Sequence, residues 1–439
     1  MKKILSLLLM LAFVFSLGSA MAEYEVNTEL SGTLTYWSCF AGDSMIWDQW
    51  RIGEFEKMYP NVTVDVQFVP DSAGMRNGKL MAAIAGNTAP DVVCADDYIT
   101  SFGFAAQGAF ESWDPYMDVT GLDLSEFMPG FSNLMQYKGT TYLLPQDSNV
   151  IYLFLNTDMF AEIGLDATVD YPKNIEELDE LAEKLTVKDE NGNVTRYGFI
   201  PWLDSGNDAL LWPFMFGGEI YDAETNQLIL DDPAIIGSLN WQNTYALEYG
   251  AERMRSFTPE GGGGGLFSPD HPFFTSNVAM VVVGNWATNA LRIYAPDINY
   301  TVCPIPVPPG GRFESTPLGS NVFAIPIGAK RPDLAAAFFA FCQRPEINGN
   351  NFDVWRSIPV IDRLFDEVSW IINGDPIYEL GRKIANSDLS SHPGLCTVSA
   401  QLRAEMLALR DDVIYNNVDP QPLLQELQAK LQPELDAAQ

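Results

Sequence analysis

Hydrophobic and polar positions follow two different patterns along this chain, and both are typical of β-strands. In residues 62–68 every second side chain is apolar, as in a strand that is buried on one face only. In residues 150–155 the apolar run is unbroken, as in a strand that is covered on both faces. The early part of the chain predicts three strands joined by two helices, at residues 33–37, 45–58, 62–68, 77–85 and 91–95. This alternation predicts a mostly parallel sheet flanked by helices.

Helical periodicity is clearest after residue 173. Asn174 stands three residues before Glu177, a spacing typical of a capping box at the start of a helix. Apolar residues then recur on one side, which predicts an amphipathic helix over residues 175–185. Similar stripes over residues 402–413 and 423–431 predict two terminal helices that face the core.

Residues 1–22 are predicted to be a signal peptide. Two lysines precede an apolar run over residues 4–17, and small residues follow at 20–22, where a signal peptidase would cleave. The run is too short for a membrane anchor. No cysteine follows it, so a lipid anchor is not expected. The chain is predicted to be exported, with the periplasm as the leading location and release from the cell as the alternative.

The charge and length of the chain narrow the class of protein. With 25 Lys and Arg against 58 Asp and Glu, the formal net charge is −33. Nucleic acids and anionic membranes attract positive surfaces, so neither is an expected partner. The part after the signal peptide is too long for one hydrophobic core, so two or more lobes are expected.

Signals of catalysis or metal binding are scarce. The two histidines, His271 and His392, share no metal-ligand spacing with each other or with any of the five cysteines. Serine-hydrolase, zinc-protease and phosphate-loop patterns are missing as well. We therefore expect no metal, no cofactor and no enzymatic activity. A secreted carbohydrate-active enzyme that uses a pair of the many carboxylates remains a lesser alternative.

Blocks of residues in a fixed order resemble a known family. Pro145, Tyr152, Asn156, Phe160 and Gly164 resemble the stretch in which family 1 extracellular solute-binding proteins pass from their first lobe to their second. Further blocks follow the family's order at residues 55–64, 85–93, 108–115, 274–286 and 319–326. The resemblance implies a two-lobe periplasmic-binding-protein fold of type II, an α/β fold in which each lobe is a mostly parallel sheet flanked by helices. It also implies a monomer that delivers a sugar or oligosaccharide to the membrane permease of an ABC transporter.

The same resemblance implies how the lobes are divided along the chain. The chain would cross between lobes near Asp147, Val302 and Gln343. The first lobe would then hold residues 23–147 and 302–343, and the second lobe residues 148–301 and 344–439. A hinge between two such lobes allows a protein to enclose its ligand.

Candidate ligand contacts lie at predicted strand ends and at the crossings, because open α/β sheets bind ligands beyond the carboxyl ends of their strands. A sugar presents an apolar face and a ring of hydroxyls, so flat aromatic rings and planar polar groups suit it. Resemblance places Trp286 against the sugar face, beside Gly284. The candidates are Trp37, Ser38, Asp43, Asp96, Asp97, Gln146, Asp147, Asn149, Trp202, Trp212, Gly284, Asn285, Trp286, Ser320, Asn321 and Arg356.

Several alternatives stay open at this level. Trp37 and Trp212 fit a core position as well as a cleft position. Asp96 and Asp97 point to opposite sides of an extended chain, so at most one is expected to face the cleft. The glycine run at residues 261–265 predicts a mobile surface connector, with a lid at the cleft edge as the alternative. The acidic composition also leaves a cationic ligand such as a polyamine as an alternative to a sugar.

Overall fold

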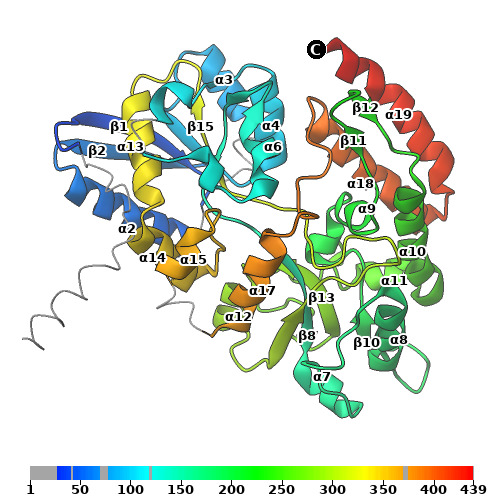
Figure 1. The fold of residues 1–439 in the computed structure, drawn as a ribbon. Helices are drawn as coiled ribbons and strands as arrows, with labels where there is room; N and C mark the ends of the chain where they lie inside the picture. The colour runs from blue at the N-terminus through cyan, green and yellow to red at the C-terminus, as the bar shows by residue number, and fades with distance from the viewer. Residues whose placement is uncertain (1–26, 41–42, 70–77, 118–120, 369–373, 439) are drawn as a thin grey trace, which may run out of the picture.

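The computed structural model describes residues 27–40, 43–69, 78–117, 121–368 and 374–438. The predicted signal peptide lies outside these residues. The described chain forms two lobes side by side, each built on its own sheet (Figure 1). No helix among the described residues is long and apolar enough to cross a membrane.

The first lobe contains a six-stranded sheet in the order β2-β1-β3-β15-β4, with β7 also paired to β15. Strands β1, β2 and β3 are mutually parallel, as predicted, and β15 runs against them. The strands span Gly32–Ser38 (β1), Val62–Phe68 (β2), Val92–Ala95 (β3), Phe110–Glu111 (β4), Leu144–Pro145 (β7) and Val322–Pro326 (β15). Its helices span Asp43–Met58 (α2), Lys79–Ala85 (α3), Tyr98–Ala106 (α4), Ser132–Met135 (α6) and Pro332–Cys342 (α13).

The second lobe contains a five-stranded sheet in the order β14-β8-β13-β10-β9. The strands span Ile151–Asn156 (β8), Val187–Lys188 (β9), Val194–Phe199 (β10), Val278–Gly284 (β13) and Tyr300–Cys303 (β14). Strand β8 lies antiparallel between β13 and β14, so the predicted parallel arrangement is wrong at this position. Strand β8 follows β7 of the first lobe directly, and the chain runs through β8 in the direction opposite to β13 and β14. Its central place explains the unbroken apolar run, because nearly all of its residues are buried.

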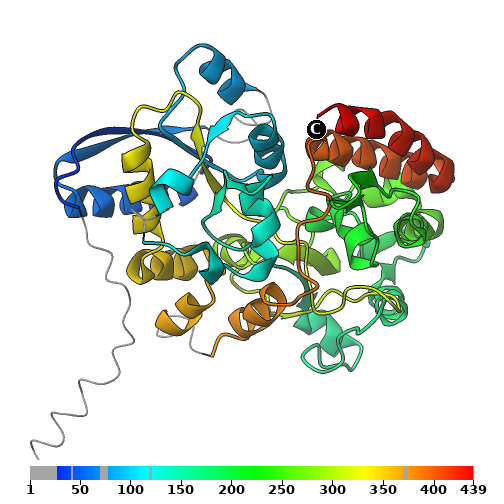
Figure 2. The same cartoon turned by 45° about the horizontal axis from the view of Figure 1, so that its top comes forward.

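Helices cover the second sheet and extend beyond it. They span Thr157–Glu162 (α7), Ile175–Leu185 (α8), Leu211–Met215 (α9), Pro233–Tyr249 (α10), Ala251–Arg255 (α11), Ala287–Tyr294 (α12), Ser399–Asn416 (α18) and Pro420–Ala437 (α19). The Asn174 side chain accepts a hydrogen bond from the Glu177 amide (2.9 Å), which confirms the predicted cap of α8. Helices α18 and α19 pack on each other at the outside of this lobe (Figure 2). A short hairpin of β11 (Tyr221–Asp222) and β12 (Gln227–Leu228) lies against α19.

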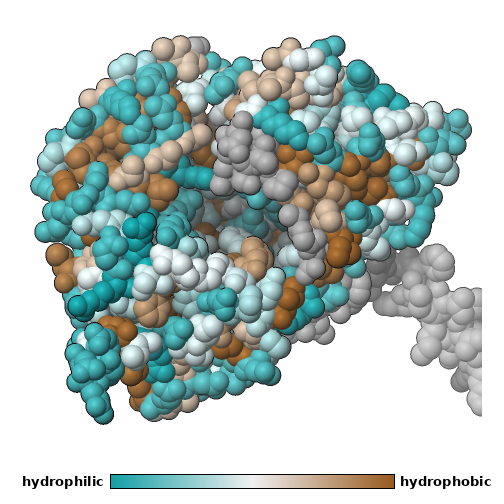
Figure 3. Space-filling model, turned by 180° about the vertical axis from the view of Figure 1, so that it is seen from behind, coloured by the Kyte–Doolittle hydropathy of each residue, from teal (hydrophilic) through white to brown (hydrophobic). Residues whose placement is uncertain are grey.

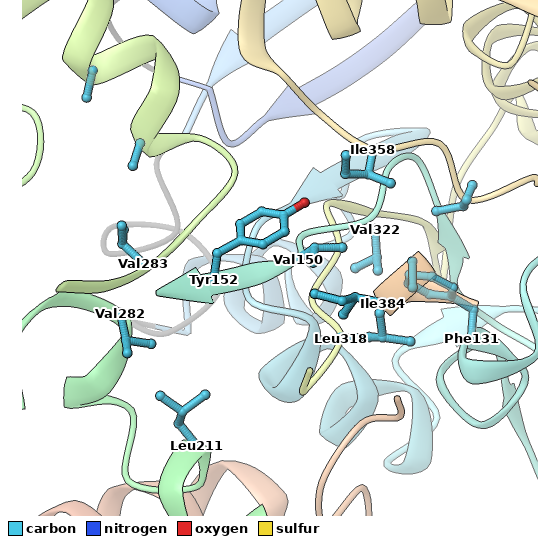
Figure 4. Close-up of a cluster of buried hydrophobic side chains, with 14 of the residues drawn as sticks. Phe131, Val150, Tyr152, Leu211, Val282, Val283, Leu318, Val322, Ile358 and Ile384 are labelled. Atoms are coloured by element: carbon cyan, nitrogen blue, oxygen red, sulfur yellow. The ribbon is translucent and has the colours of Figure 1, made fainter. Parts of the chain in front are cut away.

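Within the described residues the chain passes between the two sheets after β7 and again after β14. The first crossing, from β7 to β8, includes Asp147. The expected boundary at residue 302 falls inside β14, whose residues all pair with β8. The second crossing therefore lies after Cys303 and before Val322. Figure 4 shows the apolar cluster at the first crossing, where Val150 and Tyr152 lie beside Ile358 and Val322.

The segment after α13 was assigned wholly to the second lobe, and its first part does not lie there. Helix α14 (Pro345–Trp355) packs on α2 and α13, and Arg363 of α15 (Arg363–Glu367) pairs with Glu126 at 2.9 Å. Helix α17 (Pro376–Ala385) reaches the second lobe, because the Tyr152 hydroxyl of β8 donates to the Ile377 carbonyl. Helix α14 thus packs on the first lobe and also contacts α12 of the second.

Candidate functional site

A cavity of about 430 Å³ lies between the two lobes, and we refer to it as the interlobe cleft. Its volume is in the range of small-molecule sites. The face opposite to that of Figure 1 is hollowed near its centre (Figure 3). The cleft is lined from both lobes and from the crossings by Asp96, Tyr98, Ile99, Asn149, Ile151, Asp204, Ser205, Asp208, Leu210, Leu211, Leu266, Phe267, Val283, Trp286, Pro317, Gly319 and Pro393.

Trp286 supplies a broad aromatic surface to this cleft. It follows β13 and stands at the start of α12, and it is only partly buried. A side chain on Gly284 would collide with the indole ring of Trp286. The absence of a side chain at Gly284 therefore lets the indole of Trp286 lie across the end of the strand.

Two further aromatic residues line the cleft from opposite sides. Tyr98 begins α4 in the first lobe, and its ring meets that of His392 edge-on, with 5.1 Å between the ring centroids. Burial raises the pKa of the Tyr98 phenol, and the nearby Asp208 raises it further, so the hydroxyl keeps its proton. Phe267 comes from the second lobe and leaves 59% of its surface exposed. The cleft therefore offers aromatic faces on both of its walls.

Three carboxylates line the same cleft, and no lysine or arginine joins them among the described residues. Asp96 is exposed at the end of β3. The Nε2 atom of the buried His271 lies 2.7 Å from Asp204, and Asp208 accepts a hydrogen bond from the Leu210 amide (2.9 Å). Of the adjacent pair, Asp96 borders the cleft, whereas Asp97 is buried and caps α4 through the Thr100 amide.

Several predicted contact residues lie in the core instead. Trp212 is fully buried and donates to the Pro201 carbonyl (2.8 Å), and its ring packs on Trp241. Trp202 and Ser38 are buried as well, and Trp37 is half-buried under the Lys79 ammonium group. None of these four lines the cleft. The side chain of Asp43 lies outside the described part of the chain.

Another set of predicted residues ties the crossings together. One oxygen of the buried Asp147 accepts from the Asn321 backbone amide (3.0 Å), and the other from the Asn321 side chain (2.9 Å) and Ser357 (3.3 Å). Asn285 accepts from the Val150 amide and donates to the Arg356 carbonyl, both at 2.9 Å. These polar groups form hydrogen bonds within the protein. They therefore stabilise the crossings at the hinge and do not line the cleft.

The remaining predicted polar residues divide between the hinge and the cleft. Gln146 is buried and accepts a hydrogen bond from Arg51, which has no exposed surface. Ser320 is also fully buried. Asn149 lines the cleft, and its backbone exchanges hydrogen bonds with that of Gly319. Of the crossing residues that were predicted as contacts, Asn149 is the one that borders the cavity.

Part of the cleft lies outside the set of candidate contacts. Asp204, Ser205 and Asp208 belong to a loop after β10 that the sequence marks by its density of polar residues. Phe267 follows the glycine run at residues 261–265. A side chain on Gly261, Gly263 or Gly264 would collide with neighbouring backbone, so the run is a tightly packed turn rather than an open connector. It places Phe267 at the cleft edge.

Comparison with known proteins agrees with this architecture. Residues 44–349 match the family of bacterial extracellular solute-binding proteins. The chain is 24% identical over 363 residues to the maltotriose-binding protein of Pyrococcus abyssi, covering 80% of this chain and 73% of that protein. It also resembles CpMnBP1 with mannotriose bound, at 30% identity and a TM-score of 0.80, covering 91% of this chain and 99% of the other. A second CpMnBP1 structure, with mannobiose bound, gives the same values.

The family match spans well over half of the chain. It includes every strand of the second sheet, every strand of the first sheet except β1, and every residue that lines the cleft except Pro393. The solved structures confirm the two-lobe α/β fold that the sequence blocks implied. The chain is a member of the bacterial extracellular solute-binding protein family.

Proposed function

We propose that this protein captures a short oligosaccharide in the interlobe cleft and delivers it to the membrane permease of an ABC transporter. The proposal rests on the lining of this one cavity. Trp286 lines it from one lobe and Tyr98 from the other, and carboxylates lie at its border. Aromatic rings suit the apolar face of a sugar, and carboxylates accept hydrogen bonds from its hydroxyls. The resemblance to a mannotriose complex makes a manno-oligosaccharide the first candidate.

The arrangement also supports a mechanism of capture. Asp96 and Tyr98 reach the cleft from the first lobe, and Asp204 and Trp286 reach it from the second. A ligand that contacts both sets is bound more tightly when the lobes are together, so binding shifts the population toward the closed state. Next to the cleft, Arg403 of α18 lies 3.6 Å from Asp97, a contact between the lobes. The closed form would then dock on the permease from the periplasm, as a monomer and without altering the sugar.

Calorimetric titration of the mature protein with mannobiose, mannotriose, maltotriose and mannose tests this function. We expect saturable binding of one oligosaccharide class and recovery of the sugar unchanged. At about 100 times its Kd the ligand should stabilise the protein by about 2.7 kcal/mol, which a thermal-shift measurement detects. Release of shorter sugars would instead support a carbohydrate-active enzyme. Failure of all four sugars to bind would contradict the proposal.

A cationic ligand is the second candidate, because three carboxylates line the cleft with no basic side chain among the described residues. A spermidine titration at low and high salt distinguishes the two. Attraction between charges is screened by salt, so spermidine binding should weaken steeply, whereas binding of a neutral sugar should hardly change. Spermidine binding with no response to any sugar would favour the second candidate.

His271 is predicted to act as a positioning residue for Asp204. Its ring is fully buried, and in the described structure its Nδ1 atom has no hydrogen-bond partner, so Asp204 is what its polar edge contacts. We expect His271→Phe to weaken sugar binding about three- to ten-fold, the cost of about one hydrogen bond. His271→Gln keeps a donor and should retain most of the affinity.

A double-mutant cycle provides the control for this role. In an Asp204→Asn background, His271→Phe should cost no further affinity, because the group that it positions has been changed. Equal losses for His271→Phe and His271→Gln, or full additivity with Asp204→Asn, would show that His271 acts only through the fold.

A further inference from the structure

One helix of the first lobe reaches into the apolar core of the second lobe. Ile99 lies in the first turn of α4 and is buried. It belongs to an apolar cluster whose other buried members all come from the second lobe, mainly from α10, α18 and α19. Phe102, one turn later in α4, packs instead in the cluster that contains the buried residues of the first sheet. Helix α4 is therefore shared between the two lobes.

An ion pair joins the same two parts of the protein. Asp97 is the N-cap of α4, and its Oδ1 atom lies 3.6 Å from Nη1 of Arg403 in α18. The carboxylate of Asp97 is buried, whereas the guanidinium group of Arg403 is partly exposed. Because one partner is buried, the attraction between the two charges is screened less than that of a fully exposed pair. The pair and Ile99 thus act at the same end of α4.

Helix α18 is fixed to the second lobe and lies away from the ligand site. Arg410 of α18 is buried and donates to the Asn207 carbonyl (2.8 Å) and to the Asn207 side chain (2.9 Å). The helix also packs on α10, α11 and α19. None of its described residues lines the interlobe cleft, and it lies beyond residue 349, where the family match ends. A movement of the second lobe away from the first would therefore carry α18 away from α4.

Such a movement would break both contacts. Ile99 would leave its apolar surroundings, and the exposure of apolar surface to water is unfavourable. Asp97 and Arg403 would lose their mutual attraction. Both contacts are made by protein atoms alone, so they oppose the opening of the lobes whatever ligand the cleft binds.

We propose that the first turn of α4 and helix α18 form a latch, made by Asp97, Ile99 and Arg403, that favours the closed arrangement of the lobes before any ligand binds. This inference rests on the closing motion that the proposed function uses, and not on the identity of the ligand. A ligand that binds the closed form binds more tightly when more of the protein is already closed. The latch therefore strengthens the binding of every ligand of the cleft.

The latch is testable on the protein alone. Two exposed positions, Thr63 of β2 in the first lobe and Glu180 of α8 in the second, are replaced by cysteine and carry spin labels. The five native cysteines are buried, so the labels attach selectively. Pulsed dipolar spectroscopy then gives the distribution of distances between the labels. The ratio of closed to open molecules follows from that distribution.

We expect a closed population in the wild type without a ligand. Ile99→Ala should lower the ratio of closed to open molecules at least about ten-fold, because it removes three buried carbon atoms from the contact. Arg403→Gln should lower the ratio about two- to five-fold, as for a partly exposed ion pair, and this surface variant should fold even if Ile99→Ala does not. Arg255→Gln is the matched control, because Arg255 of α11 pairs with Glu252 (3.7 Å) within the second lobe. It should leave the ratio unchanged.

A double-mutant cycle tests the ion pair itself. Asp97→Asn keeps an oxygen that caps α4 but removes the charge. Its effect should match that of Arg403→Gln, and the double variant should lose no more than either single variant. A wild type that is wholly open without a ligand, or a ratio that neither Ile99→Ala nor Arg403→Gln changes, would overturn the latch. A latch that is detected here while every sugar fails to bind would support this inference and contradict only the proposed ligand.

Discussion

Replacement of Trp286 by alanine is expected to reduce the affinity for the cleft sugar at least about thirty-fold, a loss of about 2 kcal/mol or more. Tryptophan side chains that are central to an interface typically contribute this much, because a large rigid ring is desolvated with few rotors to freeze. Trp286 is partly exposed and lines the cleft, so the unfolding temperature should change little. Titration with the bound oligosaccharide measures the loss.

Two further variants distinguish the loss of this ring from a general effect on the fold. Gly284→Ala removes no ligand-facing atom but forces the indole of Trp286 away from the strand end, so it should also weaken binding. Trp50→Ala changes a tryptophan of α2 that is 38% exposed and away from the cleft, so it should leave affinity unchanged. Wild-type affinity in Trp286→Ala would place the sugar elsewhere.

Asp147→Ala is expected to lower the free energy of unfolding by about 3 kcal/mol. Asp147 is 1% exposed, and its carboxylate joins the first crossing to Asn321 at the second and to Ser357 after α14. The alanine variant would leave buried donors at all of these places without an acceptor, which costs more than the lost contacts alone. Chemical denaturation measures the change, with Asp65→Ala on the exposed face of β2 as the control.

The contribution of Asp147 to the stability of the fold should depend on pH in a defined direction. Burial raises the pKa of Asp147, and the hydrogen bonds from Asn321 and Ser357 oppose that rise. The folded protein therefore holds a proton here more readily than the unfolded chain. The resulting stabilisation is fully present below the unfolded pKa of about 3.9 and is lost as pH rises through the folded value. The difference in stability between wild type and Asp147→Asn should follow this trend, and a difference that grows with rising pH would contradict it.

Local patterns were sufficient to predict several elements of the fold. The alternation in β2, the continuous apolar run of β8 and the cap of α8 at Asn174 all appear in the structure as predicted. Each depends on neighbours within a few residues, which the sequence displays directly. The direction of β8 could not be predicted in this way, because it depends on which lobe the chain comes from.

The cleft was predictable only in part, and the tryptophans show why. Resemblance placed Trp286 against the sugar, whereas the apolar neighbours of Trp212 in the sequence left a core position and a cleft position both open. Trp241 of α10, far along the chain, covers Trp212, whereas Gly284 and an open cavity leave Trp286 partly uncovered. Likewise, Asp147 looked like a ligand contact until Asn321 and Ser357 were seen to use its oxygens.

The sequence by itself determined several strands and helices, the family and the existence of two lobes, because periodicity and the order of blocks are properties of the chain alone. The tertiary structure decided which polar and aromatic side chains face the cleft, because burial depends on what packs from distant segments. It also decided that the buried carboxylate of Asp147 bonds Asn321 and Ser357, and that Ile99 of the first lobe is buried among side chains of the second. Both features join residues from separate parts of the chain, and such contacts leave no local pattern in the sequence.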